Sequence, residues 1–215
     1  MTRVPWLHVV TDDAVLAREG IGIELSAVLE AGGSAVAVHI RGPHTDGGRL
    51  FELAAIMRPL ANERGTSLYV NDRIDIALAV GLDGIHLGQR SLPAFVARRL
   101  VGPSLMLGAS VHTEEELTDA VDGGADYAFA GTLFSTPSHG GSDPRGLPLL
   151  PALRAAAHGA NLIGIGGVTP ERVASVLAAG AVGVAVVSGI WDADSPAKAV
   201  GAYLSELEAS QGDGS

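Results

Sequence analysis

Eight short apolar segments, each followed by a stretch with helical spacing, organise this chain of 215 residues. The segments are rich in Val, Ile, Leu and Ala, which is typical of strands buried on both faces of a parallel sheet. Eight such units without a dividing linker predict an α/β fold, a (β/α)₈ barrel, in preference to an open doubly wound sheet with fewer strands. The expected strands are 7–11, 35–41, 67–70, 84–87, 105–110, 126–130, 162–165 and 184–187.

The whole barrel is expected to be a single domain. It would occupy residues 1–209, with a disordered tail at 210–215. A polar loop without periodicity covers about 131–146, and loops of this length in compact domains are usually functional. Thr113 followed by Glu116 predicts a capping box at the start of the helix after the fifth strand. These features place the expected chemistry in the loops that follow the strands.

The charge balance limits which partners the chain binds. It contains 14 Lys and Arg against 24 Asp and Glu, and the formal net charge of −10 argues against a nucleic-acid surface. No segment is long and apolar enough to span a bilayer, and polar residues interrupt any signal peptide. The sequence has no cysteine, which excludes disulfides and thiolate chemistry. We therefore expect a cytoplasmic protein with no nucleic-acid partner and no membrane partner.

Two glycine-containing turns follow the seventh and eighth expected strands. Gly166 and Gly167 end the seventh strand, and Val187, Ser188 and Gly189 end the eighth. Turns at these two places in a (β/α)₈ barrel frequently bind phosphate, and glycines leave backbone N–H groups uncovered for an anion. The alternative is that the glycines serve only the close packing of helices on strands. For the pair, we favour one phosphate group held between the two turns.

Polar side chains at the ends of the other strands are candidates for the rest of the site. His8, His39 and His86 lie in or at the ends of the first, second and fourth strands, and neutral imidazoles near the axis would carry protons. Hydrogen-bonded core histidines are the alternative. Asp72 either binds Mg²⁺ or helps to cap a helix. The other candidates are Arg41, Asn71, Ser110, Thr132, Thr136, Ser138 and His139.

Several collinear motifs resemble those of the thiamine-phosphate synthase superfamily and extend over nearly the whole chain. The resemblance implies a (β/α)₈ barrel that acts in thiamine biosynthesis as a homodimer. It also implies that Gly166, Gly167, Val187 and Ser188 hold the phosphate of thiazole phosphate. The motifs are 70–79, 83–89, 110–113, 124–127, 165–170 and 185–190.

One branch of this superfamily, the true synthases, joins thiazole phosphate to a pyrimidine methyl diphosphate and expels diphosphate with Mg²⁺. Asp72 matches the first metal ligand of that branch, whereas Ser91 stands where a second carboxylate is usual. The usual Gln and Lys after strand two are replaced by His39 and Pro43, and a loop Lys by His139. Departure of diphosphate needs strong charge neutralisation, so these losses should slow a synthase considerably.

The other branch, the TenI-like proteins, includes thiazole tautomerases, which aromatise a carboxythiazole phosphate by moving a proton without a metal. Residues 7–13 and 39–41 resemble this branch more closely. Its proton-carrying His after the sixth strand is replaced here by Thr132. His39 and His8 are therefore the expected proton carriers, with His139 as a candidate from the loop.

The sequence thus leads to three functional hypotheses. The favoured one is a TenI-like thiazole tautomerase without a cofactor, in which Arg41 pairs with the carboxylate of the substrate. The first alternative is a thiamine-phosphate synthase with Mg²⁺ on Asp72. The second is a non-catalytic regulatory protein that binds thiazole phosphate.

Overall fold

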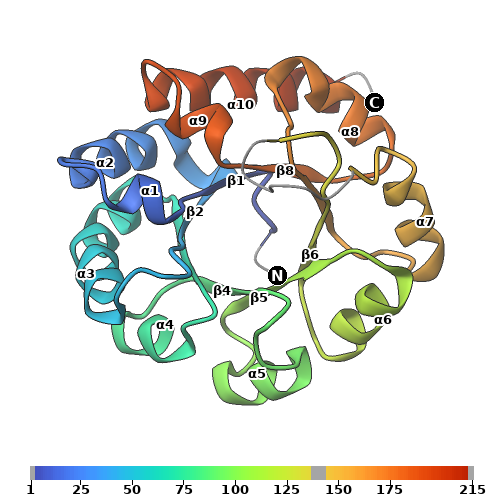
Figure 1. Ribbon diagram of the computed structural model, residues 1–215, viewed down its shortest axis with the longest axis horizontal. Coiled ribbons are helices and arrows are strands. Elements are labelled where there is room, and N and C mark those ends of the chain that lie inside the picture. Colours follow the sequence, from blue (N-terminus) through green and yellow to red (C-terminus); the bar gives the residue numbers. More distant parts are fainter. Residues whose placement is uncertain (1–2, 137–143, 213–215) are drawn as a thin grey trace.

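A closed barrel of eight parallel strands forms the centre of the molecule, and helices surround it (Figure 1). The computed structural model describes residues 3–136 and 144–212. The strands pair in chain order, and the last strand closes the barrel on the first, with His8 opposite Ala185. This topology confirms the predicted (β/α)₈ barrel. The strands are β1 (Leu7–Val10), β2 (Val36–Ile40), β3 (Ser67–Asn71), β4 (Gly84–Leu87), β5 (Met106–Val111), β6 (Tyr127–Ala130), β7 (Leu162–Ile165) and β8 (Gly183–Val186).

The outer ring consists of helices that follow the strands (Figure 1). The final helix continues through Gly212, so residues 210–212, which were expected to fray, are helical. Within the described ranges, no helix has the length and apolar character needed to cross a membrane. The helices are α1 (Asp13–Leu16), α2 (Ile21–Gly32), α3 (Gly47–Arg64), α4 (Ile74–Val80), α5 (Ala94–Val101), α6 (Glu114–Asp122), α7 (Leu149–Ala156), α8 (Val173–Ala178), α9 (Ser188–Trp191) and α10 (Pro196–Gly212), with 3₁₀ turns η1 (Gly33–Ala35) and η2 (Pro170–Arg172).

Successive residues of each strand face opposite sides of the barrel wall. In β1, Leu7 and Val9 pack into the layer between the strands and the helices, whereas Val10 belongs to the cluster inside the barrel. The ring of His8 also lies inside, where its centroid is 4.9 Å from that of Tyr127. Because both faces are buried, the alternation leaves an almost unbroken apolar run in the sequence.

Aromatic rings fill much of the barrel interior, and glycines in the neighbouring strands make room for them. A Cβ on Gly108 would lie 2.1 Å from Cζ of Tyr127, and one on Gly84 would lie 2.9 Å from Cε1 of Tyr69. Tyr69, Tyr127 and Phe129 are almost completely buried. The interior is therefore packed rather than hollow, which leaves the chemistry to the end of the barrel.

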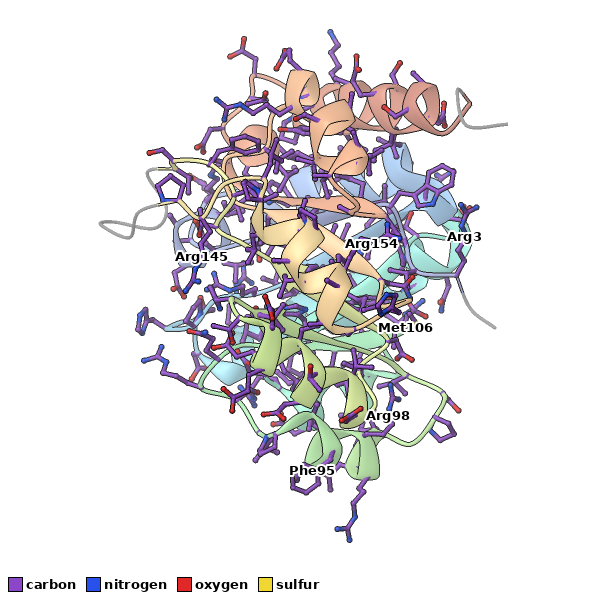
Figure 2. All side chains as sticks on the ribbon, turned by 90° about the vertical axis from the view of Figure 1, so that its right-hand side faces the viewer. Arg3, Phe95, Arg98, Met106, Arg145 and Arg154 are labelled. Carbon is purple, nitrogen blue, oxygen red and sulfur yellow. The ribbon has the colours of Figure 1, made fainter. Side chains whose placement is uncertain are left out.

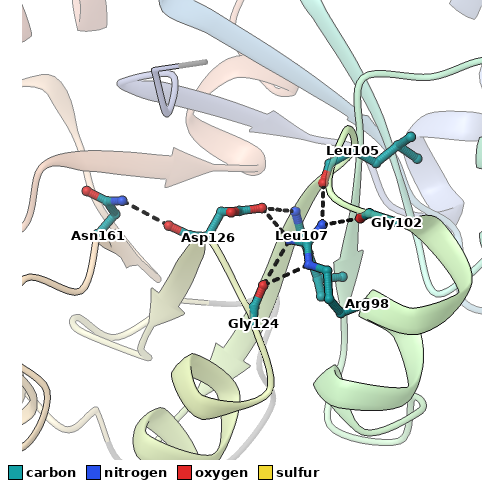
Figure 3. Close-up of polar contacts among 7 residues, drawn as sticks. All are labelled: Arg98, Gly102, Leu105, Leu107, Gly124, Asp126 and Asn161. Atoms are coloured by element: carbon teal, nitrogen blue, oxygen red, sulfur yellow. Dashed lines mark hydrogen bonds and ion pairs between the residues drawn. The ribbon is translucent and has the colours of Figure 1, made fainter. Parts of the chain in front are cut away.

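Two similar ion pairs tie strands together at the end of the barrel where the strands begin. Asp126 accepts the N–H of Leu107 at 2.8 Å and the Nη2 of Arg98 at 2.6 Å (Figure 3). Asp83 does the same with the N–H of Leu68 and with Arg58. Each carboxylate joins the start of one strand to the strand before it, so each pair holds two neighbouring strands in register.

The predicted capping box at α6 forms in an altered register. The hydroxyl of Thr113 accepts the N–H of Glu116 at 3.2 Å, as expected for an N-cap. The carboxylate of Glu116, however, accepts the N–H of His112 rather than that of Thr113. The side chain of Glu116 thereby fastens the end of β5 to the first turn of the helix.

Candidate functional site

The ends of the strands and the loops that follow them form one face of the barrel, called here the barrel mouth. In the side view, Arg145 lies at the end of the molecule where the strands finish, and Arg3 lies at the opposite end (Figure 2). The backbone N–H of Arg145 donates to the carbonyl oxygen of Thr132 at 2.9 Å. The last part of the β6–α7 segment is thus joined back to its beginning beside the mouth.

A small cavity of about 40 Å³ lies at the mouth between the ends of β7 and β8. The cavity is large enough only for a small group, and glycine-containing turns and aliphatic side chains form its wall. The structure therefore brings together the two glycine turns that the sequence paired, and it adds Thr136 from the β6–α7 segment. The lining residues are Thr136, Ile165, Gly166, Gly167, Val168, Ala185, Val186, Val187, Ser188 and Gly189.

The glycines of this cavity are required by close approach and by backbone conformation. Gly167 has a φ of +62°, and a Cβ there would lie 2.7 Å from the carbonyl oxygen of Ser135. Gly166 has a φ of +98°, and its Cβ would lie 2.4 Å from Cγ2 of Thr132. L-residues with a side chain rarely adopt such φ values. The turn after β7 can therefore keep its shape only with glycine at both positions.

Tyr203 of α10 supports the cavity from behind. Its hydroxyl donates to the carbonyl oxygen of Val168 at 2.9 Å, and its side chain is buried. A Cβ on Gly189 would lie 2.3 Å from the same hydroxyl. The last helix thus holds the turns after β7 and β8 in place. No local pattern in the sequence predicts the contact with Val168, because Tyr203 lies 35 positions further along the chain.

Arg41 is fixed at the end of β2 by a buried threonine. The hydroxyl of Thr11 accepts the N–H of Arg41 at 2.8 Å and donates to its carbonyl oxygen at 2.9 Å. Thr11 is fully buried and Arg41 is half-buried. The arrangement holds the arginine backbone at the mouth, where the guanidinium is available to an anionic ligand.

Asp72 follows β3 in a backbone conformation that is unusual for a residue with a side chain. Among the described residues other than glycine, it alone has a positive φ, of 62°. Its Oδ1 accepts the N–H of Gly88 at 2.7 Å, and its own N–H donates to the carbonyl oxygen of His86. Such conformations cost free energy and persist where the surroundings enforce them, often at functional sites. The carboxylate is thereby held at the exposed edge of the mouth.

Three histidines converge inside the barrel, as their strand positions predicted. The ring centroid of His39 lies 5.1 Å from that of His8 and 5.8 Å from that of His86. All three side chains are buried from solvent. Burial is the main cause that lowers the pKa of each imidazole, and for His39 it lowers the pKa to about 3. The three rings are therefore neutral at physiological pH.

The ring nitrogens of His8 and His39 are occupied by protein contacts. His8 bonds Pro5 and His39, and His39 bonds His8 and Asn71. Neither ring lies at the mouth, so neither is placed to exchange a proton directly with a bound ligand. The structure thus gives these two residues the packing environment of hydrogen-bonded core histidines, the alternative weighed for them from the sequence.

Ser110 is connected to the third histidine. His86 Nε2 lies 2.9 Å from the hydroxyl of Ser110, and its Nδ1 lies 3.3 Å from the hydroxyl of Tyr127. Ser110 is half-buried at the end of β5, so its hydroxyl is positioned by the interior of the barrel. Burial raises the pKa of Tyr127 well above its ordinary value, which keeps that phenol neutral.

Two of the expected site residues, Ser138 and His139, lie outside the described residues. Thr132 is half-buried beside the cavity, next to Gly166. Among the described residues, no group of three or more His, Asp or Glu side chains is arranged to hold a metal ion.

A larger hollow of about 940 Å³ lies beside the mouth, between the β4–α5 loop and α6. Three carboxylates and one guanidinium are among its lining groups, together with apolar side chains such as Phe95; the charged residues are Glu116, Asp119, Asp122 and Arg90. Carboxylates repel phosphate and diphosphate. No carboxylate is among the described residues that line the cavity between β7 and β8.

Comparisons with known proteins identify relatives along most of the chain. The family model described as thiamine monophosphate synthase matches residues 7–190. A thiamine-phosphate synthase of Moorella thermoacetica is 45% identical over 159 residues, which cover 74% of this chain and 75% of that protein. A thiamine-phosphate synthase of Chloroflexus aurantiacus is 41% identical over 194 residues, covering 89% of this chain and 88% of that protein.

The fold comparison agrees with the sequence comparison. A solved structure of a thiamine phosphate pyrophosphorylase from Pyrococcus furiosus superposes with a TM-score of 0.81 and 31% sequence identity. The match covers 95% of this chain and 96% of that one. The relatives bear the name of a synthase, so the comparisons support the superfamily resemblance without supporting the TenI-like branch in particular.

Proposed function

The chain belongs to the thiamine monophosphate synthase family, and we propose that it is a thiamine-phosphate synthase. In the proposed reaction the ring nitrogen of thiazole phosphate bonds to the methylene carbon of a pyrimidine methyl diphosphate. The bond between that carbon and the diphosphate oxygen breaks, and diphosphate leaves with the bonding electron pair. The observation that carries this proposal is the similarity along the whole barrel to relatives named as synthases.

Burial of the histidines also favours the synthase over the tautomerase. The tautomerase hypothesis gave the proton transfer to His39, His8 or His139, of which His139 lies outside the described residues. The rings of His39 and His8 are buried, and the nitrogens of both are engaged with protein groups. A proton carrier has to reach the reacting atom directly or through one water molecule. Condensation of two substrates makes no such demand on either imidazole.

Two parts of the mouth would have separate tasks in this reaction. The turns at Gly166–Gly167 and Ser188–Gly189 would hold the phosphate of thiazole phosphate through backbone N–H groups. Arg41, at the end of β2 and separated from β8 by β1 alone, would pair with the diphosphate of the second substrate. Binding the two anions at separate places of the mouth would orient the two substrates relative to each other.

Mg²⁺ fits the available residues only as a cation shared with the substrate. Magnesium is commonly bound by one or two carboxylates together with substrate phosphates and water. Asp72 supplies one carboxylate, held in position by its contact with Gly88. When bound there, the ion would neutralise charge on the departing diphosphate. Ser91, at the usual place of a second carboxylate, lacks the charge to make a protein cage.

The mouth is poorer in cations than is usual for such a reaction. Pro43 stands in place of a lysine, and the chain carries a net charge of −10. The loss of one donor to a developing negative charge costs about 3 kcal/mol of transition-state stabilisation. We therefore propose a slow synthase that depends strongly on the concentration of Mg²⁺.

The direct test combines both substrates with Mg²⁺ and the purified chain. Mass spectrometry would measure thiamine phosphate, and a coupled phosphate assay would measure diphosphate released. We expect the two products in equal amounts. If no product forms at high enzyme concentration, the proposal fails. Acceleration of carboxythiazole aromatisation would then support the tautomerase, and binding of thiazole phosphate without either reaction would support a regulatory protein.

A matched pair of glycine variants tests the phosphate cavity. Gly167→Ala introduces both an unfavourable φ and a Cβ against the carbonyl oxygen of Ser135. Gly81→Ala at the end of α4 introduces the same kind of strain, with a φ of +71°, but its Cβ meets nothing within 4 Å. We expect only Gly167→Ala to abolish binding of thiazole phosphate measured by calorimetry. Equal binding by both variants would contradict the assignment of the cavity.

A further inference from the structure

A chain of hydrogen bonds runs through the barrel from the backbone before β1 to the end of β3. His8 Nε2 lies 3.1 Å from the carbonyl oxygen of Pro5. His8 Nδ1 lies 2.9 Å from His39 Nε2, and His39 Nδ1 lies 3.1 Å from the side-chain amide of Asn71. Both imidazoles are inaccessible to solvent. Every proton in this chain must therefore be accounted for by its own members.

The first link fixes the proton of His8. A carbonyl oxygen can only accept a hydrogen bond, so Nε2 of His8 must carry the proton that Pro5 accepts. A neutral imidazole carries one N–H, which leaves Nδ1 of His8 as an acceptor. His39 Nε2, which faces that acceptor, must then be a donor.

The rule that a neutral imidazole carries one N–H also fixes the roles of the two nitrogens of His39. His39 uses its single N–H toward His8, so its Nδ1 is also an acceptor. The group of Asn71 that faces this nitrogen must therefore be the NH₂, although the atom placed there is Oδ1. Half a turn of the amide about its Cβ–Cγ bond exchanges the two groups with almost no change in shape.

Both rings are neutral because a charge would be isolated there. The groups packed around them are Tyr69, Tyr127, Phe129 and the third histidine, none of which is an anion at neutral pH. The nearby charge of Arg41 further disfavours a proton on His39. An imidazolium without a negative partner in such a place is costly.

We propose that His8 and His39 are positioning residues that turn the side-chain oxygen of Asn71 toward the barrel mouth. The carbonyl of Pro5 sets the direction, and each ring transmits it to the next. Asn71 is 9% exposed at the end of β3, directly before Asp72, so the group that faces away from His39 faces the mouth. The mouth is thereby supplied with an acceptor rather than a donor at this point.

This orientation has a consequence for specificity, and only this consequence rests on the proposed synthase function. A carbonyl oxygen at Asn71 accepts an N–H or a water O–H of the ligand, or approaches a cation. It repels a phosphoryl oxygen. At this point of the mouth, Asn71 would therefore favour a hydrogen-bond donor of the bound ligands.

Nitrogen NMR of the intact chain tests the tautomers without any enzyme assay. In protein labelled with ¹⁵N at histidine and asparagine, long-range ¹H–¹⁵N spectra distinguish protonated from unprotonated ring nitrogens. We expect His8 and His39 each to carry the proton on Nε2 at pH 7.5. We also expect a coupling through the hydrogen bond between Nδ2 of Asn71 and Nδ1 of His39, and its persistence on adding Mg²⁺ and diphosphate.

Two variants separate the relay from general packing. His8→Leu removes the first ring, and we expect the His39 signal to change from one tautomer to a mixture of two. His86→Gln alters another buried histidine of the same interior but leaves the relay intact, so His39 should keep its tautomer. If either variant fails to fold, the tautomers of His8 and His39 in the spectrum of the unchanged protein decide the test.

Several results would overturn the proposal. A proton on Nδ1 of His39, or an imidazolium at either ring at pH 7.5, would contradict the direction of the chain. An unchanged His39 tautomer in folded His8→Leu would show that the first ring does not set it. Because none of these readouts requires turnover, a failure of the synthase assay and a failure of this proposal remain distinguishable.

Discussion

Acidification should destabilise this protein through its three buried histidines. Burial lowers the pKa of His8, His39 and His86, while the same side chains in the unfolded chain titrate near 6.5. Below pH 6.5 the unfolded state therefore binds protons that the folded state excludes. The stability contributed by neutral burial is fully present above pH 6.5 and is lost as the pH falls toward the folded pKa, which for His39 is about 3.

The size of the effect follows from the distance in pH below the unfolded pKa. At pH 5.5, one unit below the pKa of the unfolded chain, each buried imidazole lowers the free energy of unfolding by about 1.4 kcal/mol. Three of them lower it by about 4 kcal/mol. Carboxylates contribute little over this range, because they remain ionised in both states. The free energy of unfolding of a folded domain is typically about 5–15 kcal/mol, so a loss of about 4 kcal/mol is a large part of it.

Urea unfolding at pH 7.5 and 5.5 measures this loss, with circular dichroism and tryptophan fluorescence as two probes whose transitions should coincide. The parent should lose about 4 kcal/mol on acidification. His86→Gln keeps a polar side chain but cannot be protonated, so its loss should be smaller by about 1.4 kcal/mol, whatever its stability at pH 7.5. His158→Gln, on the exposed segment after α7, serves as the matched control.

The test compares the loss of unfolding free energy between pH 7.5 and pH 5.5 in each protein, and not the stability of each protein at one pH. If His86→Gln loses as much stability between the two pH values as the parent does, the buried imidazole is not the group that titrates. If His158→Gln shows the smaller loss instead, an exposed histidine accounts for the pH dependence. Either result would refute the reasoning from burial.

Three further predictions concern other parts of the molecule. Arg98→Ala should lower the free energy of unfolding by about 3 kcal/mol, because several carbonyls and a carboxylate lose their donor. In the same urea titration, Arg99→Ala at an exposed position should change the free energy of unfolding by less than about 0.5 kcal/mol. Equal losses in the two variants would contradict this prediction. Tyr203→Phe should cost about 1 kcal/mol and raise the KM for thiazole phosphate, since the carbonyl of Val168 loses its partner; an unchanged KM would show that the turn needs no such support. Arg41→Ala should raise the KM for the diphosphate substrate more than that for thiazole phosphate, and steady-state kinetics showing the reverse would remove the assigned role.

Local pattern determined most of the secondary structure of this chain. The bounds of α4 (Ile74–Val80) follow from local sequence, because an apolar face and a final glycine define it. The capping residue Thr113 also acts as its sequence predicts. Pro and Gly at loop positions, together with eight repeated units, were enough to identify the barrel. Such features depend on residues a few positions apart, which sequence alone displays.

The meeting of the two glycine turns was also foreseeable, since barrel topology places the ends of neighbouring strands together. Its supports were not. Tyr203 reaches Val168 from 35 positions away, and Thr11 fixes Arg41 from 30 positions away. Such contacts leave no periodic trace in the sequence.

The histidines show where sequence reasoning ended. Strand positions determined that His8, His39 and His86 share the barrel interior, because side chains on alternate residues face one side of a strand. Only the tertiary structure decided that the first two are sealed from the mouth and bonded to each other. Burial and hydrogen-bond partners arise from every strand of the closed barrel at once, and the chemistry of an imidazole depends on both.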